Sequence, residues 1–205
     1  LGWDHDNIII GQLAEQLQDC GIQALTIHGR TRSQVYNGEA DWEPIRRVKA
    51  NPRIHIPIIG NGDVTSGEVA RRRFEETGVD GIMVGRATFG RPWIFAEINR
   101  SLGKEASGPP GPPGNVIKPP HEPLSLDWKL DVLMDEVRRS VERNGTVGGL
   151  IHMRRHIAAS PLFKGIRDFR ATRIAMLRSE NIDEMLGLME GTRPLLEQGN
   201  ENINP

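Results

Sequence analysis

Short apolar runs separated by amphipathic stretches dominate the first half of the chain. Apolar runs occur at 24–28, 56–59 and 81–84, and each ends abruptly at glycine or a polar residue. The stretches beside them repeat apolar residues three or four positions apart, as in a helix with one buried face, at 6–19, 41–50, 65–77 and 92–102. This alternation predicts parallel βα units and therefore an α/β fold.

The composition changes near residue 104. Glycine and proline crowd residues 107–114, and further prolines follow at 119, 120 and 123. Both residue types oppose helix formation, so we predict an exposed linker at 104–123 between a first domain at 1–103 and a second one. Helical periodicity returns at 124–143, 147–159, 166–179 and 182–190. We therefore expect a small all-α domain at 124–190 and a weakly ordered tail at 191–205.

Composition indicates a soluble protein of a reducing compartment. Hydrophobic residues make up 37% and charged residues 26% of the 205 residues, which is usual for globular domains. We find no run of the roughly 20 apolar residues that a membrane helix needs. The chain opens without a secretory pattern, and its one cysteine, Cys20, cannot form an internal disulfide, so we expect a cytoplasmic protein. Cys20 ends the first predicted helix just before Gly21, and we expect it to pack as a buried or half-buried side chain.

Charge is unevenly distributed along the chain. The formal net charge is −1, yet residues 128–178 hold 11 Lys and Arg against 5 Asp and Glu, and residues 179–205 hold 1 against 6. A local basic block favours a surface that binds a polyanion. A solvated helical face explains the same block equally well.

Polar residues follow each predicted strand, and parallel strands bring their carboxyl ends to one edge of a sheet, where phosphates commonly bind. The turn Gly60-Asn-Gly-Asp63 allows close backbone approach, and Asn61 offers a donor and an acceptor. A plain βα turn explains it as well. Arg86, after Gly85, suits a bidentate phosphate contact or a surface ion pair. His28 suits a cofactor contact or a structural role.

The order of these motifs resembles that of the tRNA-dihydrouridine synthases. The motifs that carry the resemblance are His28-Gly-Arg-Thr-Arg, Ile59-Gly-Asn-Gly-Asp, Asp80-Gly-Ile-Met-Val-Gly-Arg-Ala and Gly90-Arg-Pro-Trp-Ile-Phe. After the linker it resumes at Met153-Arg-Arg-His, Lys164-Gly and Phe169-Arg. It covers most of 1–103 and, more loosely, 128–190.

The resemblance implies a fold and an activity. Members of this family are FMN-dependent TIM barrels followed by a helical domain that helps hold tRNA. They reduce the 5,6 double bond of uridine with NADPH as reductant: reduced flavin gives a hydride, and an acidic cysteine protonates the other carbon. We therefore expect an α/β fold formed by the C-terminal part of a TIM (β/α)8 barrel, with the small all-α domain after it.

The resemblance also implies site residues. An FMN phosphate site is expected at Asn61, Gly62, Asp63, Gly85 and Arg86, with His28 near the flavin and Arg30 facing the flavin or the substrate base. Contacts to the tRNA backbone are expected from Arg154, Arg155, His156, Lys164, Arg167, Arg170 and Arg173, several of which are three residues apart and so are predicted roughly along one helix side. No metal and no membrane contact are expected.

The chain departs from the family in its extent. A closed (β/α)8 barrel takes at least about 200 residues, yet only the runs at 24–28, 56–59 and 81–84 read as strands here. The catalytic cysteine and the flavin-contacting lysine are expected upstream of Leu1, so no residue of this chain is assigned a catalytic role. We expect a C-terminal portion whose partner is the missing N-terminal half of the barrel, and which is inactive alone.

Two other functions fit the same residues. One is a non-catalytic RNA-binding remnant that retains the helical domain, and the other is a different FMN-dependent TIM-barrel oxidoreductase acting on a small molecule. Salt-dependent tRNA binding separates the small-molecule enzyme from the other two.

Overall fold

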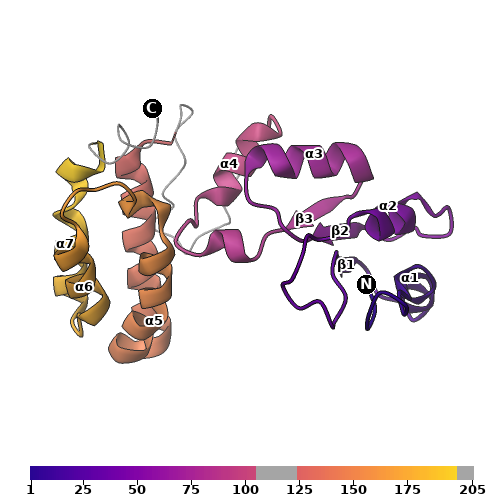
Figure 1. Ribbon diagram of the computed structural model, residues 1–205, viewed down its shortest axis with the longest axis horizontal. Coiled ribbons are helices and arrows are strands. Elements are labelled where there is room, and N and C mark those ends of the chain that lie inside the picture. Colours follow the sequence, from indigo (N-terminus) through magenta and orange to yellow (C-terminus); the bar gives the residue numbers. More distant parts are fainter. Residues whose placement is uncertain (105–123, 198–205) are drawn as a thin grey trace. The chain divides into compact units, whose positions relative to one another are not determined.

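The computed structural model describes residues 1–104 and 124–197. They divide into two compact units, one of residues 1–87 with 98–104 and the other of residues 88–97 with 124–197 (Figure 1). The expected linker at 104–123 lies outside the described residues apart from Lys104. Each unit is a separate body, which we call the sheet unit and the helical unit.

The sheet unit is built on three parallel strands. These are β1 (Leu25–His28), β2 (Ile58–Asn61) and β3 (Gly81–Met83), in the order β1-β2-β3. Leu25 pairs with Ile58 across the first ladder, and Ile59 pairs with Gly81 across the second. The predicted α/β class and parallel strands are thereby confirmed, and each strand is followed by a helix, as βα units require.

Three helices of the sheet unit are α1 (Ile10–Asp19), α2 (Glu43–Ala50) and α3 (Gly67–Thr77). Helix α1 begins later than the predicted residue 6, because Gly2 and Ile8 form an antiparallel bridge before it. The cap of α3 is Ser66, whose hydroxyl accepts a hydrogen bond from the Val69 N–H at 3.2 Å. Gly78, with φ of 67°, ends α3.

Trp42 joins the sheet to its turns. Its ring is buried, and a Cβ added to Gly60 in β2 would overlap it. The indole Nε1 donates a hydrogen bond to the Gly62 carbonyl oxygen at 3.0 Å. The aromatic ring thus packs on the strand while its polar edge satisfies the turn that follows.

The helical unit is dominated by α5 (Leu126–Ala159), which contains a reversal. Gly145 has non-helical angles, with φ of 72° and ψ of 166°. Glu136 Oε1 lies 3.2 Å from His156 Nδ1, although residues 20 apart in a straight helix are about 30 Å apart. Two helical segments therefore fold back on each other at Gly145, which confirms the predicted gap between 143 and 147.

The rest of the helical unit packs against this pair of segments. It comprises η2 (Pro161–Phe163), α6 (Arg170–Arg178), α7 (Ile182–Glu190) and η3 (Arg193–Leu195). Helix α6 begins at Arg170 and not at the predicted 166. Residues 191–197, expected in the weakly ordered tail, include η3 and the buried Leu196, while residues 198–205 lie outside the described part.

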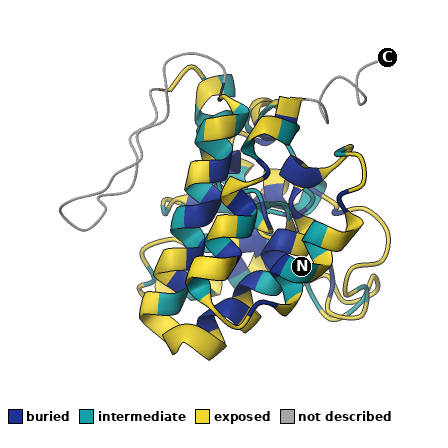
Figure 2. Ribbon diagram, turned by 90° about the vertical axis from the view of Figure 1, so that its left-hand side faces the viewer, coloured by how far each residue is buried: buried dark blue, intermediate teal, exposed yellow. Residues whose placement is uncertain are grey.

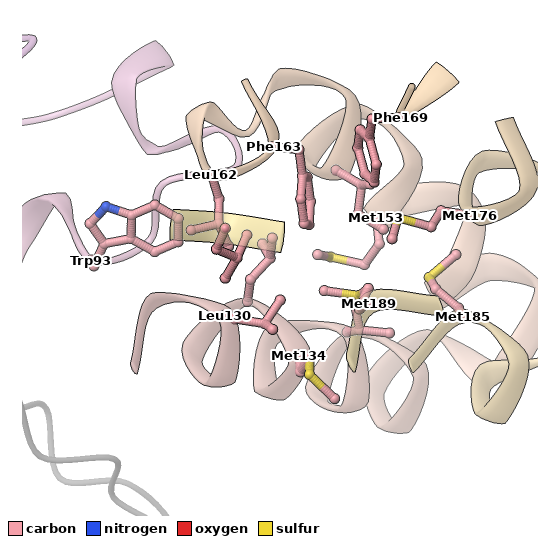
Figure 3. Close-up of a cluster of buried hydrophobic side chains, with 14 of the residues drawn as sticks. Trp93, Leu130, Met134, Met153, Leu162, Phe163, Phe169, Met176, Met185 and Met189 are labelled. Atoms are coloured by element: carbon pink, nitrogen blue, oxygen red, sulfur yellow. The ribbon is translucent and has the colours of Figure 1, made fainter. Parts of the chain in front are cut away.

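Figure 2 shows buried residues on one side of these helices and exposed residues on the other. The core between them holds Met153, Met176, Met185 and Met189 beside Phe163 and Phe169 (Figure 3). Trp93, which precedes α4 (Ile94–Ser101), also lies in this core. Unbranched methionines fill the irregular space between crossing helices.

Cys20 is exposed, so the prediction that it packs in a core is wrong. It is the C-cap of α1, where its N–H donates to the Gln16 carbonyl oxygen at 3.1 Å. Its chain neighbours Asp19 and Gly21 are exposed as well, so the thiol lies at the surface. Among the described residues, no helix combines the length and the apolar character that crossing a membrane requires.

Candidate cofactor and nucleic-acid sites

The carboxyl ends of the three strands lie side by side. His28 at the end of β1 pairs with Asn61 at the end of β2, and Asn61 pairs with Met83 at the end of β3. The Asn61 amide also donates to the Met83 carbonyl oxygen at 2.8 Å, which ties β2 to β3. The sheet thus brings the loops after all three strands to one edge, as predicted.

Asp63 is the centre of the polar groups at this edge. Its Oδ2 accepts from Arg30 Nη2 at 2.7 Å and from the Ala40 N–H at 2.8 Å. Its Oδ1 accepts from Arg86 Nη2 at 2.8 Å. One carboxylate therefore holds two arginines that follow two different strands.

Arg30 is buried and only partly satisfied. Its side chain is 3% exposed, and its Nη2 donates both to Asp63 and to the Gly38 carbonyl oxygen at 2.6 Å. Its Nε and Nη1 are buried without a hydrogen-bond partner among the described residues. Buried donors of a charged group are costly to leave unpaired, so Arg30 is suited to a ligand that accepts hydrogen bonds.

The charges of this edge follow from its contacts. Burial alone would raise the pKa of the Asp63 carboxyl, but hydrogen bonds from Arg30 and the Ala40 N–H, with the charge of Arg86, lower it below its usual range. Burial and the nearby Arg30 lower the pKa of His28. At neutral pH the edge therefore carries an ionised Asp63, two guanidinium groups and a neutral His28.

The two glycines of the expected site differ in their surroundings. Gly62 has a φ of 133°, and a Cβ there would lie 2.5 Å from Ala40 Cβ. A Cβ at Gly85 would meet nothing within 4 Å. Gly62 is therefore required by the turn itself, whereas the space beside the Cα of Gly85 is unoccupied by protein atoms.

Tyr36 is a site residue that the sequence did not single out. The Arg86 guanidinium carbon lies 4.7 Å from the centre of its ring, and Tyr36 is 63% exposed. The sequence signal that could have identified it is that Tyr36 is the one aromatic residue in the polar loop 29–40. Its exposed ring packs on the arginine and can also meet a ligand.

The basic residues expected to contact RNA lie on different segments, and the expectation of a single helix side is wrong. Lys164 and Arg167 lie between η2 and α6, while Arg170 and Arg173 begin α6. Three of these side chains line a groove of about 590 Å³, which is bounded by Phe163, Lys164, Gly165, Ile166, Asp168, Phe169, Arg170 and Arg173. The rings of Phe163 and Phe169 are stacked, with centroids 5.3 Å apart.

The other expected RNA contacts lie on the second segment of α5, where Arg155 is exposed, Arg154 is half-buried and His156 is only 7% exposed. The His156 ring packs against Phe89 and His152, with centroid distances of 5.3 and 5.2 Å. Burial lowers the pKa of His156 and raises the pKa of Glu136 to about 7. His156 is thus a packed residue beside Glu136, and its ring does not form the surface.

The sequence of this chain matches a known protein family. The family model of dihydrouridine synthase matches residues 1–184. The chain therefore belongs to the dihydrouridine synthase family.

Several similar proteins are named tRNA-dihydrouridine synthase B. The tRNA-dihydrouridine synthase B of Yersinia pestis is 52% identical over 118 residues, which are 56% of this chain and 35% of the relative. That of Escherichia coli (strain K12) is 47% identical over 115 residues, 56% of this chain and 35% of the relative. That of Pasteurella multocida is 38% identical over 157 residues, 77% of this chain and 43% of the relative. The chain thus spans between about a third and under half of the length of these relatives.

Proposed function

We propose that this chain takes part in the FMN-dependent reduction of uridine to dihydrouridine in tRNA, with NADPH as reductant. The observation that carries the proposal is the Arg30–Asp63–Arg86 network at the carboxyl ends of parallel strands in a member of the dihydrouridine synthase family. Phosphate-bearing cofactors bind at this edge of TIM barrels. The three βα units then correspond to later units of such a barrel.

The residues at the strand ends fit an FMN molecule. The side chain of Arg86 is 53% exposed, so its guanidinium is accessible to a phosphate. Gly85 precedes it and has no side chain to obstruct the approach of a ligand. Asn61 and Gly62 line the same turn, while His28 and the unpaired nitrogens of Arg30 suit acceptors on the flavin. Reduced FMN supplies the hydride that the reaction needs.

The helical unit supplies the RNA contacts in this proposal. Lys164 and Arg170 are exposed cations that line one groove, and Arg167 and Arg155 are exposed as well. Lysine and arginine at such positions contact phosphates without reading sequence. Residues 124–190 are thus proposed as the tRNA-binding domain.

The experiment uses the full-length gene product. The purified protein is expected to release FMN on denaturation, and to form dihydrouridine in tRNA from a strain that lacks the modification when NADPH is supplied. The variant R86A is expected to lose most of its FMN. Arg46→Ala is the matched control, because Arg46 is likewise a half-exposed arginine held by a carboxylate, that of Glu43 at 2.6 Å on α2. Within the described residues, no hydrogen bond or ion pair joins Arg46 to Asp63 or Arg86.

Three outcomes distinguish the candidate functions. FMN binding with reduction of a small molecule but no tRNA binding would favour another flavin oxidoreductase. Salt-dependent tRNA binding without flavin or dihydrouridine formation would favour an RNA-binding remnant. Retention of FMN by R86A would contradict the proposed phosphate site.

A further inference from the structure

We propose that the Asp63 side chain is a positioning group of the cofactor site, which orients Arg30 and Arg86 toward an anionic cofactor without touching the phosphate itself. This inference rests on the proposed function, since it concerns the same site. It assigns to Asp63 a role that differs from that of its neighbours Asn61 and Gly62.

The hydrogen bonds at Asp63 leave little capacity for a ligand. Both carboxylate oxygens already accept bonds from arginine side chains, and Oδ2 accepts the Ala40 N–H as well. A carboxylate has no donor to offer a phosphate, and two anions in contact repel each other. The side chain of Asp63 therefore acts on an anion only through the groups that it holds.

Asp63 fixes both arginines at one of their nitrogens. It contacts only Nη2 of each guanidinium, and such a group carries five N–H donors. The Arg86 guanidinium carbon also lies 4.7 Å from the centre of the Tyr36 ring. Arg86 thus contacts both a carboxylate and an aromatic ring, so less side-chain entropy is lost when it binds a ligand.

The backbone at Asp63 is also unusual. Gly62 and Asp63 have φ of 133° and 53° in succession, and Asp63 is one of three non-glycine residues with positive φ among those that the structure describes. Positive φ is unfavourable for a residue with a Cβ, although aspartate tolerates it better than most. The turn keeps this conformation and places the carboxylate between Arg30 and Arg86. Local strain of this kind commonly marks functional positions.

The test compares two flavins that differ only in the phosphate. In the full-length gene product, the dissociation constants of FMN and riboflavin are measured for the wild type, D63N and R86A. We expect R86A and D63N each to lower the preference for FMN over riboflavin by about tenfold, as the loss of one charge-assisted contact predicts. We expect the double variant D63N/R86A to lower this preference no further than R86A alone, because FMN and riboflavin differ only in the phosphate, and of the two arginines that Asp63 holds only Arg86 is proposed to contact it.

Asp80→Asn is the matched control. Asp80 also holds a cation and a backbone N–H, since it accepts from Lys49 Nζ at 2.7 Å and from the Ile58 N–H at 2.8 Å, but it lies before β3, at the other end of the strands. D80N is expected to lower stability and to leave the flavin preference unchanged. An equal loss of preference in D63N and D80N would show a general loss of structure and would overturn the inference.

The results separate this inference from the proposed function. If R86A keeps the preference for FMN, the proposed phosphate site is wrong. If R86A loses the preference while D63N keeps it, the site stands and the positioning role of Asp63 is wrong. Should D63N not fold, Asp63→Glu keeps the charge but displaces it by one methylene group. The same partial loss of preference is then expected, and an unchanged preference overturns the inference.

Discussion

The hydroxyl of Ser140 donates a hydrogen bond to the carbonyl oxygen of Gly149 at 3.1 Å, and this contact joins the two segments of α5. A Cβ added to Gly149 would lie 2.5 Å from Val141 Cα and 2.7 Å from the Ser140 carbonyl oxygen. Both obstacles are backbone atoms, which cannot rotate away. The close approach of the segments therefore depends on a glycine at this position.

The substitution Gly149→Ala is expected to destabilise the helical unit by about 1–3 kcal/mol, the range for overpacking a tight contact. Gly148→Ala is the matched control, because its nearest neighbour would be Asn144 Cβ at an ordinary 3.6 Å. G148A is expected to raise stability by up to about 1 kcal/mol through helix propensity. Urea unfolding followed by circular dichroism measures both variants, and equal effects would contradict the proposed contact between the segments.

The pair Glu136 and His156 predicts a pH-dependent stability. Burial raises the pKa of Glu136 from 4.5 to about 7. Between these pH values the folded protein binds a proton that the unfolded chain has released, so stability falls as the pH rises from about 4.5 to 7. The full shift corresponds to about 3 kcal/mol, and solvent screening makes the loss smaller because the Glu136 side chain is 29% exposed. Burial lowers the pKa of His156, which opposes folding at pH values below 6.5.

Glu136→Gln should remove the contribution of Glu136 and leave that of His156. Relative to the wild type, E136Q is expected to gain stability steadily as the pH rises toward 8. Glu142→Gln, at an exposed position of α5, serves as the control and should follow the wild type. The measurement is the free energy of unfolding across this pH range. A constant difference between E136Q and the wild type would show that folding does not raise the pKa of Glu136.

A second packing prediction concerns the sheet unit. Gly60 lies against the face of the Trp42 ring, where a methyl group would overlap the indole carbons. Gly60→Ala is expected to lower the stability of this unit by about 1–3 kcal/mol. Gly11→Ala, on an exposed turn of α1 with nothing within 4 Å, should instead be neutral or stabilising. Thermal unfolding of both variants is the measurement, and an unchanged melting temperature in G60A would contradict the packing of Trp42.

Local patterns predicted much of this fold. The strands β1 and β3 lie within the predicted runs, and the break at Gly145 falls in the predicted gap, because apolar periodicity and glycine act through nearby residues. Tertiary burial was harder to predict. Cys20 was expected inside and is exposed, whereas His156 was expected at the surface and is buried. Which face of a helix is covered depends on partners that are distant in the sequence.

For the candidate site too, the sequence predicted the position of the residues along the chain but not their contacts. The motifs placed Arg30, Asp63 and Arg86 at strand ends, and the sheet brings them together as expected. Nothing in the sequence indicated that one carboxylate would hold both arginines, because Asp63 and Arg30 are 33 residues apart. The stacking of Tyr36 on Arg86 is likewise a product of how loop 29–40 folds back. Contacts between loops require the fold to be known first.

The groove of the helical unit leads to a prediction for RNA binding. Lys164 and Arg170 line it with exposed side chains, so each is expected to neutralise about one phosphate when tRNA binds. In the full-length gene product, K164A and R170A should each weaken tRNA binding. In each variant, the slope of the logarithm of affinity against the logarithm of salt concentration should also fall by about one.

Arg139→Ala is the control, because Arg139 on α5 is already held by Asp135 at 2.5 Å. Its loss should change the slope little. If K164A and R170A bind tRNA with the wild-type slope, the groove is not the site of phosphate contacts, and the exposed Arg155 on α5 becomes the next residue to test.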